Sequence, residues 1–279
     1  MSQEVTGIHL GFWTLPWITS HPDMPSPREI WSFGTQHIGR QVLVYDSLPS
    51  TSDVAASLAA DSAHFGTVVL AEFQTAGRGQ YGRVWQSVPG SSLLVSIVLQ
   101  PPAALRRPVI LTAWAAVSLV RAIHELTGLQ PRIKWPNDLL IDGRKVCGIL
   151  IEQSSAVVVG IGLNLNQSAS DFATATLPDA TSLAIETGER FDLRTVTAAV
   201  VRHLDNEYAH LIAGDRQSLE NEWTQRIKLV GRTVAVELAD GTVLPGRLRA
   251  LSFEALELDI GEVVPRVLQP ELVRQIRQL

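Results

Sequence analysis

The stretch QTAGRGQYGRVW, residues 74–85, decides between two kinds of fold for this chain of 279 residues. Gly77, Gly79 and Gly82 form a G-x-G-x-x-G pattern directly after the strand-like run TVVLAEF. In a dinucleotide-binding Rossmann turn, a helix would follow at once and an acidic residue would stand about 20 positions further on. Here the next run, SLLVSIVL, is strand-like, and residues 97–105 hold no Asp or Glu. The loop therefore argues against a Rossmann fold, and the lack of a following Lys-Ser/Thr pair argues against a P-loop.

Regular elements flank this loop on both sides. QVLVYDSL is strand-like, STSDVAASLAADSA resembles a capped helix, and a long apolar helix is predicted over 105–127, ended by Gly128. The runs RIKWP, LLID, KVCGILIEQ and AVVVGIGLNLN are separated by turns too short to join parallel neighbours. Helical spacing returns at 194–213 and 218–227. We therefore predict an α+β fold, with a mixed, mainly antiparallel sheet covered by helices on one side.

Differences in composition and hydrophobic pattern divide the chain into three parts. Residues 1–40 are rich in Trp, Pro and His and read as an irregular N-terminal arm, and residues 41–228 hold the α+β domain. Residues 229–279 contain short strands joined by turns, which predicts a small C-terminal β-barrel.

Composition limits the partners and the compartment. The net charge of −5 offers no general attraction to nucleic acid. Cys147 is the single cysteine, so the chain can form neither an internal disulfide nor a thiolate zinc site by itself. The N-terminus carries Glu4 and lacks the basic start of a secretory signal, and the uncharged residues 84–105 are interrupted by turn residues, unlike a membrane span. We expect a cytoplasmic protein that binds neither membrane nor nucleic acid.

The loop also carries groups that suit a phosphate. Glycines let backbone N–H groups approach an anion, the guanidinium groups of Arg78 and Arg83 can pair with it, and Trp85 offers a flat wall. Such a loop could fold over an acyl phosphate and exclude water. From these residues alone, an ordinary mobile surface loop remains the alternative.

Four blocks together resemble the biotin protein ligase family. QTAGRGQYGRVW is similar to that family's GRGRxGRxW loop, and STSDVA, KWPNDLLIDGRKVCGILIE and VVVGIGLNLN match its other blocks in order. The resemblance covers 41–228, and the C-terminal barrel fits it as well. It implies a class II synthetase-like biotin/lipoate ligase fold, in a short form that lacks the N-terminal DNA-binding domain.

The activity implied is two-step. Biotin and ATP would give biotinyl-5'-AMP and pyrophosphate, and the biotin would then pass to a lysine of a biotin carboxyl carrier protein domain. Negative charge collects on oxygen in both steps, so fixed cations and N–H donors are needed. The resemblance assigns this role to Lys134, whose position in RIKWPND would turn it away from the face of Ile133 and Trp135, and to Arg78.

The resemblance also implies that Arg78, Gly79, Gln80 and Lys134 contact biotin and that Arg78, Arg83 and Trp85 contact the adenylate. Gly79 would lend its backbone N–H, and Arg83 would reach pyrophosphate or lie on the surface. Gln80 departs from the family pattern, which commonly has arginine there, so it can donate hydrogen bonds without supplying charge. Trp85 would close over the ligand.

The biotin end is assigned to short polar side chains. Ser50, Thr51 and Ser52 match the family's biotin block, although the same residues read as a helix N-cap. Gln74 could bond the ureido group. Three strand glycines mark either close approach of the ligand or packing: Gly148, Gly160 and Gly162.

Two asparagines are expected on the ATP side. Asn164 resembles the family's ATP-side asparagine, and Asn137 with Asp138 would shape a turn or help to hold magnesium. The sequence suggests no dedicated metal site, so Mg²⁺ should arrive with ATP. Cys147, among apolar neighbours, is expected in the core.

Other functions stay open on the sequence. A lipoate or octanoate ligase or transferase would share the fold, a bifunctional ligase and transcriptional repressor would add DNA binding, and an adenylate-binding scaffold would lack turnover. The sequence is compatible with a monomer or a homodimer.

Overall fold

An eight-stranded sheet forms the centre of the molecule, in the order β1-β2-β3-β4-β8-β7-β6-β5. The computed structural model describes residues 25–154 and 156–279. The strands of this sheet are β1 (Glu29–Trp31), β2 (Val42–Leu48), β3 (Val68–Gln74), β4 (Ser92–Leu99), β5 (Arg132–Lys134), β6 (Asp138–Ile141), β7 (Arg144–Gln153) and β8 (Val157–Asn164). All neighbours are antiparallel except β2 and β3. The mixed, mainly antiparallel sheet predicted from the short turns is confirmed.

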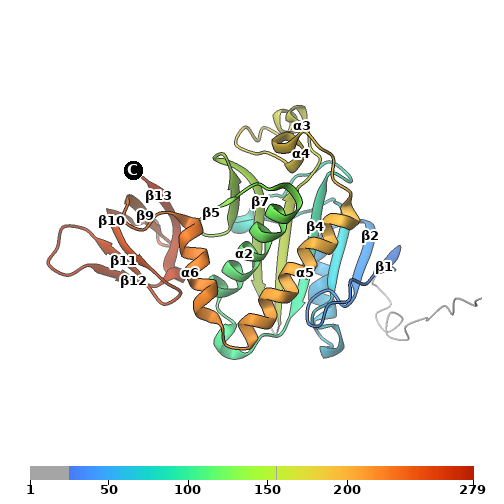
Figure 1. Cartoon of the computed structure of the whole chain (residues 1–279), viewed down its shortest axis with the longest axis horizontal. Coiled ribbons are helices and arrows are strands. Elements are labelled where there is room, and N and C mark those ends of the chain that lie inside the picture. The colour runs from blue at the N-terminus through green and yellow to red at the C-terminus, as the bar shows by residue number, and fades with distance from the viewer. Residues whose placement is uncertain (1–24, 155) are drawn as a thin grey trace, which may run out of the picture.

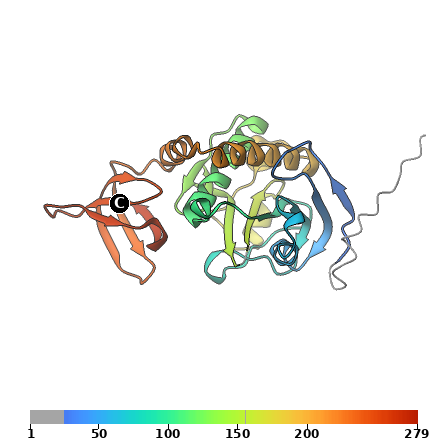
Figure 2. The same ribbon diagram turned by 90° about the horizontal axis from the view of Figure 1, so that it is seen from below.

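Helices cover both faces of this sheet, which corrects the expectation of a single covered face. The long helices are α2 (Pro108–Thr127), α5 (Leu193–Ile212) and α6 (Arg216–Ile227), and they lie together on one face (Figures 1 and 2). Helix α1 (Thr51–Leu58) packs on the opposite face of β2, β3 and β4. Strand β2 supplies both cores because its side chains alternate: Val42 and Val44 join the main core, while Leu43 and Tyr45 pack with α1.

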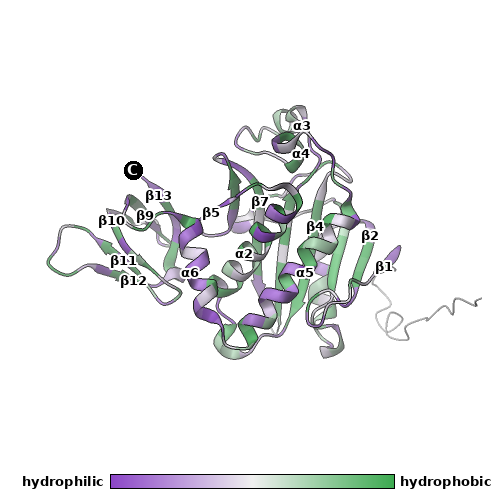
Figure 3. Ribbon diagram, viewed as in Figure 1, coloured by the Kyte–Doolittle hydropathy of each residue, from purple (hydrophilic) through white to green (hydrophobic). Residues whose placement is uncertain are grey.

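Helix α2 is the hydrophobic centre of the main core. Its length and composition would suffice to cross a membrane, yet most of it is buried between the sheet and α5, as in the core helix of a globular domain. It ends where the sequence predicted, because Gly128 takes the left-handed conformation (φ 74°) and its N–H bonds to His124 O. Figure 3 shows hydrophobic residues along the sheet and polar ones on the outer sides of α5 and α6.

The segment after residue 24 belongs to the sheet, although residues 1–40 were expected to be an irregular arm. Strand β1 pairs with β2, and Trp31 and Ile38 are buried in the main core. The Asp205 carboxylate of α5 accepts hydrogen bonds from the backbone N–H groups of residues 36–38 at 2.6–2.9 Å. A three-residue strand is too short to show alternation in the sequence, so β1 could not be predicted from its pattern. The rest of the expected arm, 1–24, lies outside the described residues.

A second, five-stranded antiparallel sheet occupies the C-terminal end, in the order β12-β11-β10-β9-β13 (Figure 1). Its strands are β9 (Thr233–Leu238), β10 (Val243–Leu251), β11 (Leu256–Asp259), β12 (Arg266–Leu268) and β13 (Val273–Gln278). Within the described residues, no pairing joins β12 to β13, so the predicted barrel is open between these strands.

The two sheets meet at a cluster of aromatic side chains. The Trp135 indole donates to the Val273 carbonyl at 3.0 Å, and Trp223 of α6 packs between Trp135 and Phe253. The ring centroids lie 5.7 and 5.2 Å apart. Trp135 is therefore a core residue, as expected, and it fixes β13 beside β5.

Candidate active site

The glycine-rich segment is a narrow hairpin between β3 and β4. The Trp85 N–H donates to Gly77 O at 2.9 Å, and the Gly79 N–H donates to Arg83 O at 2.7 Å. At the tip, Tyr81 and Gly82 both have positive φ, 58° and 73°. A strand follows rather than a helix, so the segment is not a Rossmann turn.

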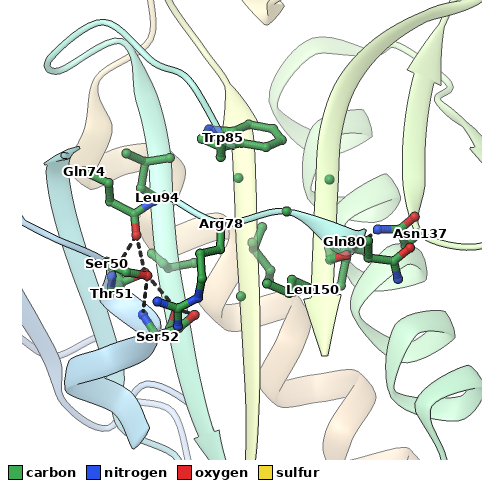
Figure 4. Close-up of a pocket in the computed structure, with 18 of the residues that line it drawn as sticks. Ser50, Thr51, Ser52, Gln74, Arg78, Gln80, Trp85, Leu94, Asn137 and Leu150 are labelled. Atoms are coloured by element: carbon green, nitrogen blue, oxygen red, sulfur yellow. Dashed lines mark hydrogen bonds between the residues drawn. The ribbon is translucent and has the colours of Figure 1, made fainter. Parts of the chain in front are cut away.

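This hairpin covers a pocket formed by the start of α1, the end of β3 and the faces of β4, β7 and β8 (Figure 4). The pocket is lined by Ser50, Thr51, Ser52, Gln74, Arg78, Gly79, Gln80, Trp85, Leu94, Val95, Ser96, Asn137, Lys145, Gly148, Ile149, Leu150, Gly160, Ile161 and Gly162. Most of the residues predicted for the site therefore come together.

A network of buried hydroxyls lies at one end of the pocket. Gln74 Oε1 accepts from both the N–H (2.7 Å) and the hydroxyl (3.0 Å) of Thr51, and Ser96 Oγ lies 2.7 Å from the Thr51 hydroxyl and 3.1 Å from that of Ser52 (Figure 4). Ser50 is also the N-cap of α1, so the N-cap and pocket roles coincide. Sequence reasoning missed Ser96, since a serine within SLLVSIVL is typical of any buried strand residue.

Glycines form the floor of the pocket because an indole lies on them. Gly148 and Gly162 face each other across β7 and β8. A Cβ on Gly162 would come within 2.5 Å of the Trp85 ring, and one on Gly148 within 2.9 Å. A Cβ on Gly160 would lie 3.4 Å from Ser52 Oγ. Close approach of a flat group thus explains two of the three glycines.

The indole of Trp85 brings a free donor to this floor. Its Nε1 is buried and has no hydrogen-bond partner among the described residues. A buried N–H without a partner costs about 1–3 kcal/mol. A ligand acceptor at this place would remove that cost.

Arg78 is held by two carboxylates at the mouth of the pocket. Its guanidinium lies 2.7 Å from Asp53 of α1 and 3.3 Å from Glu152 of β7. Burial works against the charge, but the hydrogen bonds to Asp53 and Glu152 outweigh it and raise the Arg78 pKa above its ordinary value. Arg78 stays a cation here, and it can turn donors toward an incoming anion.

The ammonium group that lines the pocket is that of Lys145, and Lys134 lies elsewhere. Lys134 is exposed on β5, opposite in direction to Ile133 and Trp135 as the alternation predicted, but this direction leads to solvent. Lys145 Nζ lies 2.6 Å from Asp138 Oδ1 and 5.5 Å from the centre of the Trp85 ring. The expectation for Lys134 is corrected accordingly.

A β-bulge gives Lys145 this direction. Leu139 pairs with Cys147 and Leu140 with Lys145, so Val146 is an extra residue in β7. Val146 and Cys147 are both fully buried. Regular alternation would have placed Lys145 on the core side with Cys147, whereas the extra residue turns it to the side of Gly148. The sequence pattern alone could not supply this turn.

Of three other predicted residues, one lines the pocket and two lie outside it. Arg83 is exposed and lines a second hollow between the hairpin and β7, with Leu150 and Glu152. Asn137 lines the pocket and fixes its turn by donating to Ile149 O at 2.6 Å. Asn164 is buried behind the pocket, where it donates to Thr181 O at 2.9 Å.

A metal-ligand cluster and an exposed thiol would be two further kinds of reactive group. No group of three His, Cys, Asp or Glu side chains in the described part of the chain could hold a metal ion. Cys147 is fully buried in the main core, and burial raises the pKa of its thiol. The pocket itself offers hydroxyls and an amide beside the start of α1, Arg78 at its mouth near Asp53, and the ammonium of Lys145 on β7.

Comparisons with known proteins agree with this geometry. The model of the biotin/lipoate A/B protein ligase family matches residues 44–166. A biotin--[acetyl-CoA-carboxylase] ligase of Mycobacterium tuberculosis is 32% identical over 234 residues, which are 80% of this chain and 84% of that protein. A bifunctional ligase/repressor of Bacillus subtilis is 32% identical over 244 residues, 85% of this chain and 75% of that protein. The chain belongs to the biotin protein ligase family.

The solved structures support the fold of this family member. The biotin protein ligase of Aquifex aeolicus in complex with biotin and ATP has a TM-score of 0.72 at 24% identity, with 85% of this chain and 99% of that chain covered. The apo structure of the same protein gives 0.69 at 21% identity over 85% of this chain and 99% of that one.

Proposed function

We propose that this biotin protein ligase family member activates biotin with ATP and attaches it to a lysine of a biotin carboxyl carrier protein domain. In the first step a biotin carboxylate oxygen bonds to the α-phosphorus of ATP and pyrophosphate leaves. In the second, the acceptor amine attacks the carbonyl carbon, loses a proton, and AMP leaves. The observation that carries the proposal is a single pocket that joins a hydroxyl and amide network at the start of α1 to the ammonium of Lys145 on β7, with the Arg78 guanidinium at its mouth beside Asp53.

The polar end of the pocket suits a urea. A ureido group presents two N–H donors and one carbonyl acceptor, and Thr51, Gln74 and Ser96 offer matching acceptors and hydroxyl donors in a buried place. Because buried polar partners favour a ligand that satisfies them, this end should reject a ligand without such groups. The dithiolane ring of lipoate has neither donor nor carbonyl, so biotin is favoured over lipoate.

Lys145 suits the acyl-phosphate end, because it projects from β7 over the glycine floor. Arg78 extends from the hairpin to Asp53 of α1 and Glu152 of β7, and it can turn its donors toward an anion bound in the pocket. Positive charge fixed beside a carboxylate and an α-phosphate stabilises the oxygens on which negative charge develops. Gln80 lines the same pocket without charge, so the retention of the adenylate depends on fewer cations than in the family pattern. Mg²⁺ enters with the ATP phosphates, which supply most of its oxygen ligands.

The test is pyrophosphate release from biotin and ATP, followed by mass measurement of a biotin carboxyl carrier domain. Release with biotin and not with lipoate is expected, and the acceptor should gain one biotin on one lysine. Thr51→Val removes a hydroxyl of the polar end while keeping the shape, and should raise the KM for biotin about tenfold. Equal turnover of lipoate, or no effect of Thr51→Val, would count against the assignment.

The same proposal extends to partners and organisation. We place catalysis in residues 41–228 and expect 229–279 to act as a small domain beside it, in a cytoplasmic protein that is a monomer or a homodimer. The net charge of −5, and the use of 29–38 in the central sheet, support a ligase without DNA binding. A mobility shift at physiological salt that depended on one operator sequence would instead favour the bifunctional repressor.

A further inference from the structure

The tip of the glycine hairpin contacts the C-terminal sheet through one pair of side chains. The guanidinium carbon of Arg274, on β13, lies 4.8 Å from the centre of the Tyr81 ring. Tyr81 has a left-handed backbone (φ 58°) and is 61% exposed. The loop pattern GRGRxGRxW leaves this position open.

Arg274 is itself held in place from two sides. The preceding carbonyl, of Val273, accepts the indole N–H of Trp135 at 3.0 Å, which fixes the start of β13 to the large domain. The Arg274 guanidinium also lies 3.5 Å from Glu237 Oε1 of β9. The Arg274 guanidinium is thus held in place by β9 and β13, and it can hold the Tyr81 ring at the tip of the hairpin.

The hairpin has two other anchors, and both lie where ligand groups must go. Trp85 packs on the glycine floor of the pocket, and the Arg78 guanidinium is paired with Asp53 and Glu152. When biotin and ATP enter, both side chains must exchange partners. Tyr81 and Arg274 do not line the pocket, so their contact can persist while the other two anchors change.

We infer that the C-terminal sheet holds the glycine hairpin over the pocket through Arg274 and Tyr81, which act as positioning residues for adenylate formation and retention. The reaction in this inference rests on the proposed function, whereas the loop contact does not. Tyr81 is the neighbour of Gln80, which lines the pocket, so fixing the tip also fixes the uncharged residue that faces the adenylate.

The first test measures opening of the ligand-free loop by limited trypsin cleavage after Arg83. When opening is fast relative to cleavage, the rate follows the open population. Loss of an exposed cation–π contact should raise that population about two- to fivefold. We expect this rise for Arg274→Met and for Tyr81→Leu. Tyr81→Phe keeps the ring and should be cleaved like the parent, as should Arg277→Met, which removes another Glu237 partner on the same strand.

The second test asks whether the two side chains act through each other. Tyr81→Leu in the Arg274→Met background should add no further increase in cleavage, because the contact is already lost. Release of preformed biotinyl-adenylate should accelerate by a similar factor in both single variants. Parent-like cleavage of Arg274→Met, multiplicative effects in the double variant, or faster cleavage with unchanged adenylate release would each overturn the inference. The cleavage assay contains neither biotin nor ATP, so failure of the proposed function would show separately.

Discussion

Replacing Lys145 by methionine removes the ammonium group that lines the pocket and keeps an unbranched apolar stem over the Trp85 ring. In adenylate formation, negative charge spreads over the oxygens of the α-phosphate and the attacking carboxylate. Loss of one fixed donor aimed at such oxygens costs about 2.7–4 kcal/mol of transition-state stabilisation, or about a hundred- to thousandfold in rate. We therefore expect Lys145→Met to lose that factor in kcat for biotin-dependent pyrophosphate release.

A matched lysine gives the control. Lys134 is exposed on β5, away from the pocket, so Lys134→Met should stay within about twofold of the parent. The Lys145 variant also leaves the Asp138 carboxylate, 17% exposed, without its partner at 2.6 Å. Adding Asp138→Asn removes that unpaired charge, and thermal melting of both variants tests the fold. A Lys145→Met enzyme that keeps the parent rate, or a Lys134→Met enzyme that loses as much, would refute the reasoning.

Three further changes test separate parts of the structure. Gly162→Ala places a Cβ within 2.5 Å of the Trp85 ring and should raise the KM for biotin about tenfold. Trp85→Ala in the same background removes that clash and should restore part of the affinity. If the affinity is not restored, the effect of Gly162→Ala does not come from contact with Trp85. Gln80→Arg adds charge to the pocket and should slow adenylate release in a chase experiment, so unchanged release would exclude a retention contact there. Burial opposes the charge of Glu222, but hydrogen bonds from Arg121 outweigh it and lower the Glu222 pKa from 4.5. Because the pKa is lower in the folded state, ionised Glu222 stabilises the fold above pH 4.5, and this stabilisation is lost as the pH falls through the folded-state pKa. Glu222→Gln should therefore lower the free energy of unfolding by about 1 kcal/mol at pH 7 and by less at lower pH. Denaturant titrations at several pH values measure the loss of unfolding free energy, and a loss that stays the same at low pH would contradict this prediction.

Local patterns in the sequence predicted most of the fold. Short turns between strand-like runs required antiparallel neighbours, and β5 to β8 form such a meander. Gly128 ends α2 in the left-handed conformation that its position after an apolar helix predicted. The strand after the glycine loop excluded a Rossmann turn. Each of these inferences depends on residues that are neighbours in the chain, where propensity and turn geometry act directly.

Contacts between distant segments were beyond such patterns. Strand β1 and its ties to α5 could not be seen in the sequence because three residues give no period, and Ser96 joins the hydroxyl network only through the pairing of β4 beside α1. The contact between Tyr81 and Arg274 likewise depends on how the two sheets meet. These pairs form only when the strand order and the packing of the two sheets bring residues from distant parts of the chain together.

The two lysines show where alternation itself fails. The pattern correctly turned Lys134 away from the core, but on β5, at the edge of the sheet, that direction is solvent. The same rule applied to β7 would have buried Lys145 with Cys147, and an ammonium there would have had no partner in an apolar core. The chain avoids this conflict by inserting Val146 as a bulge, after which Lys145 meets Asp138 and the Trp85 ring. A charge at a position where strict alternation predicts burial is thus a signal for a bulge, and bulges are over-represented beside active sites. Lys145, two residues before the buried Cys147 in KVCGILIEQ, is such a charge, and this makes it a stronger candidate than Lys134.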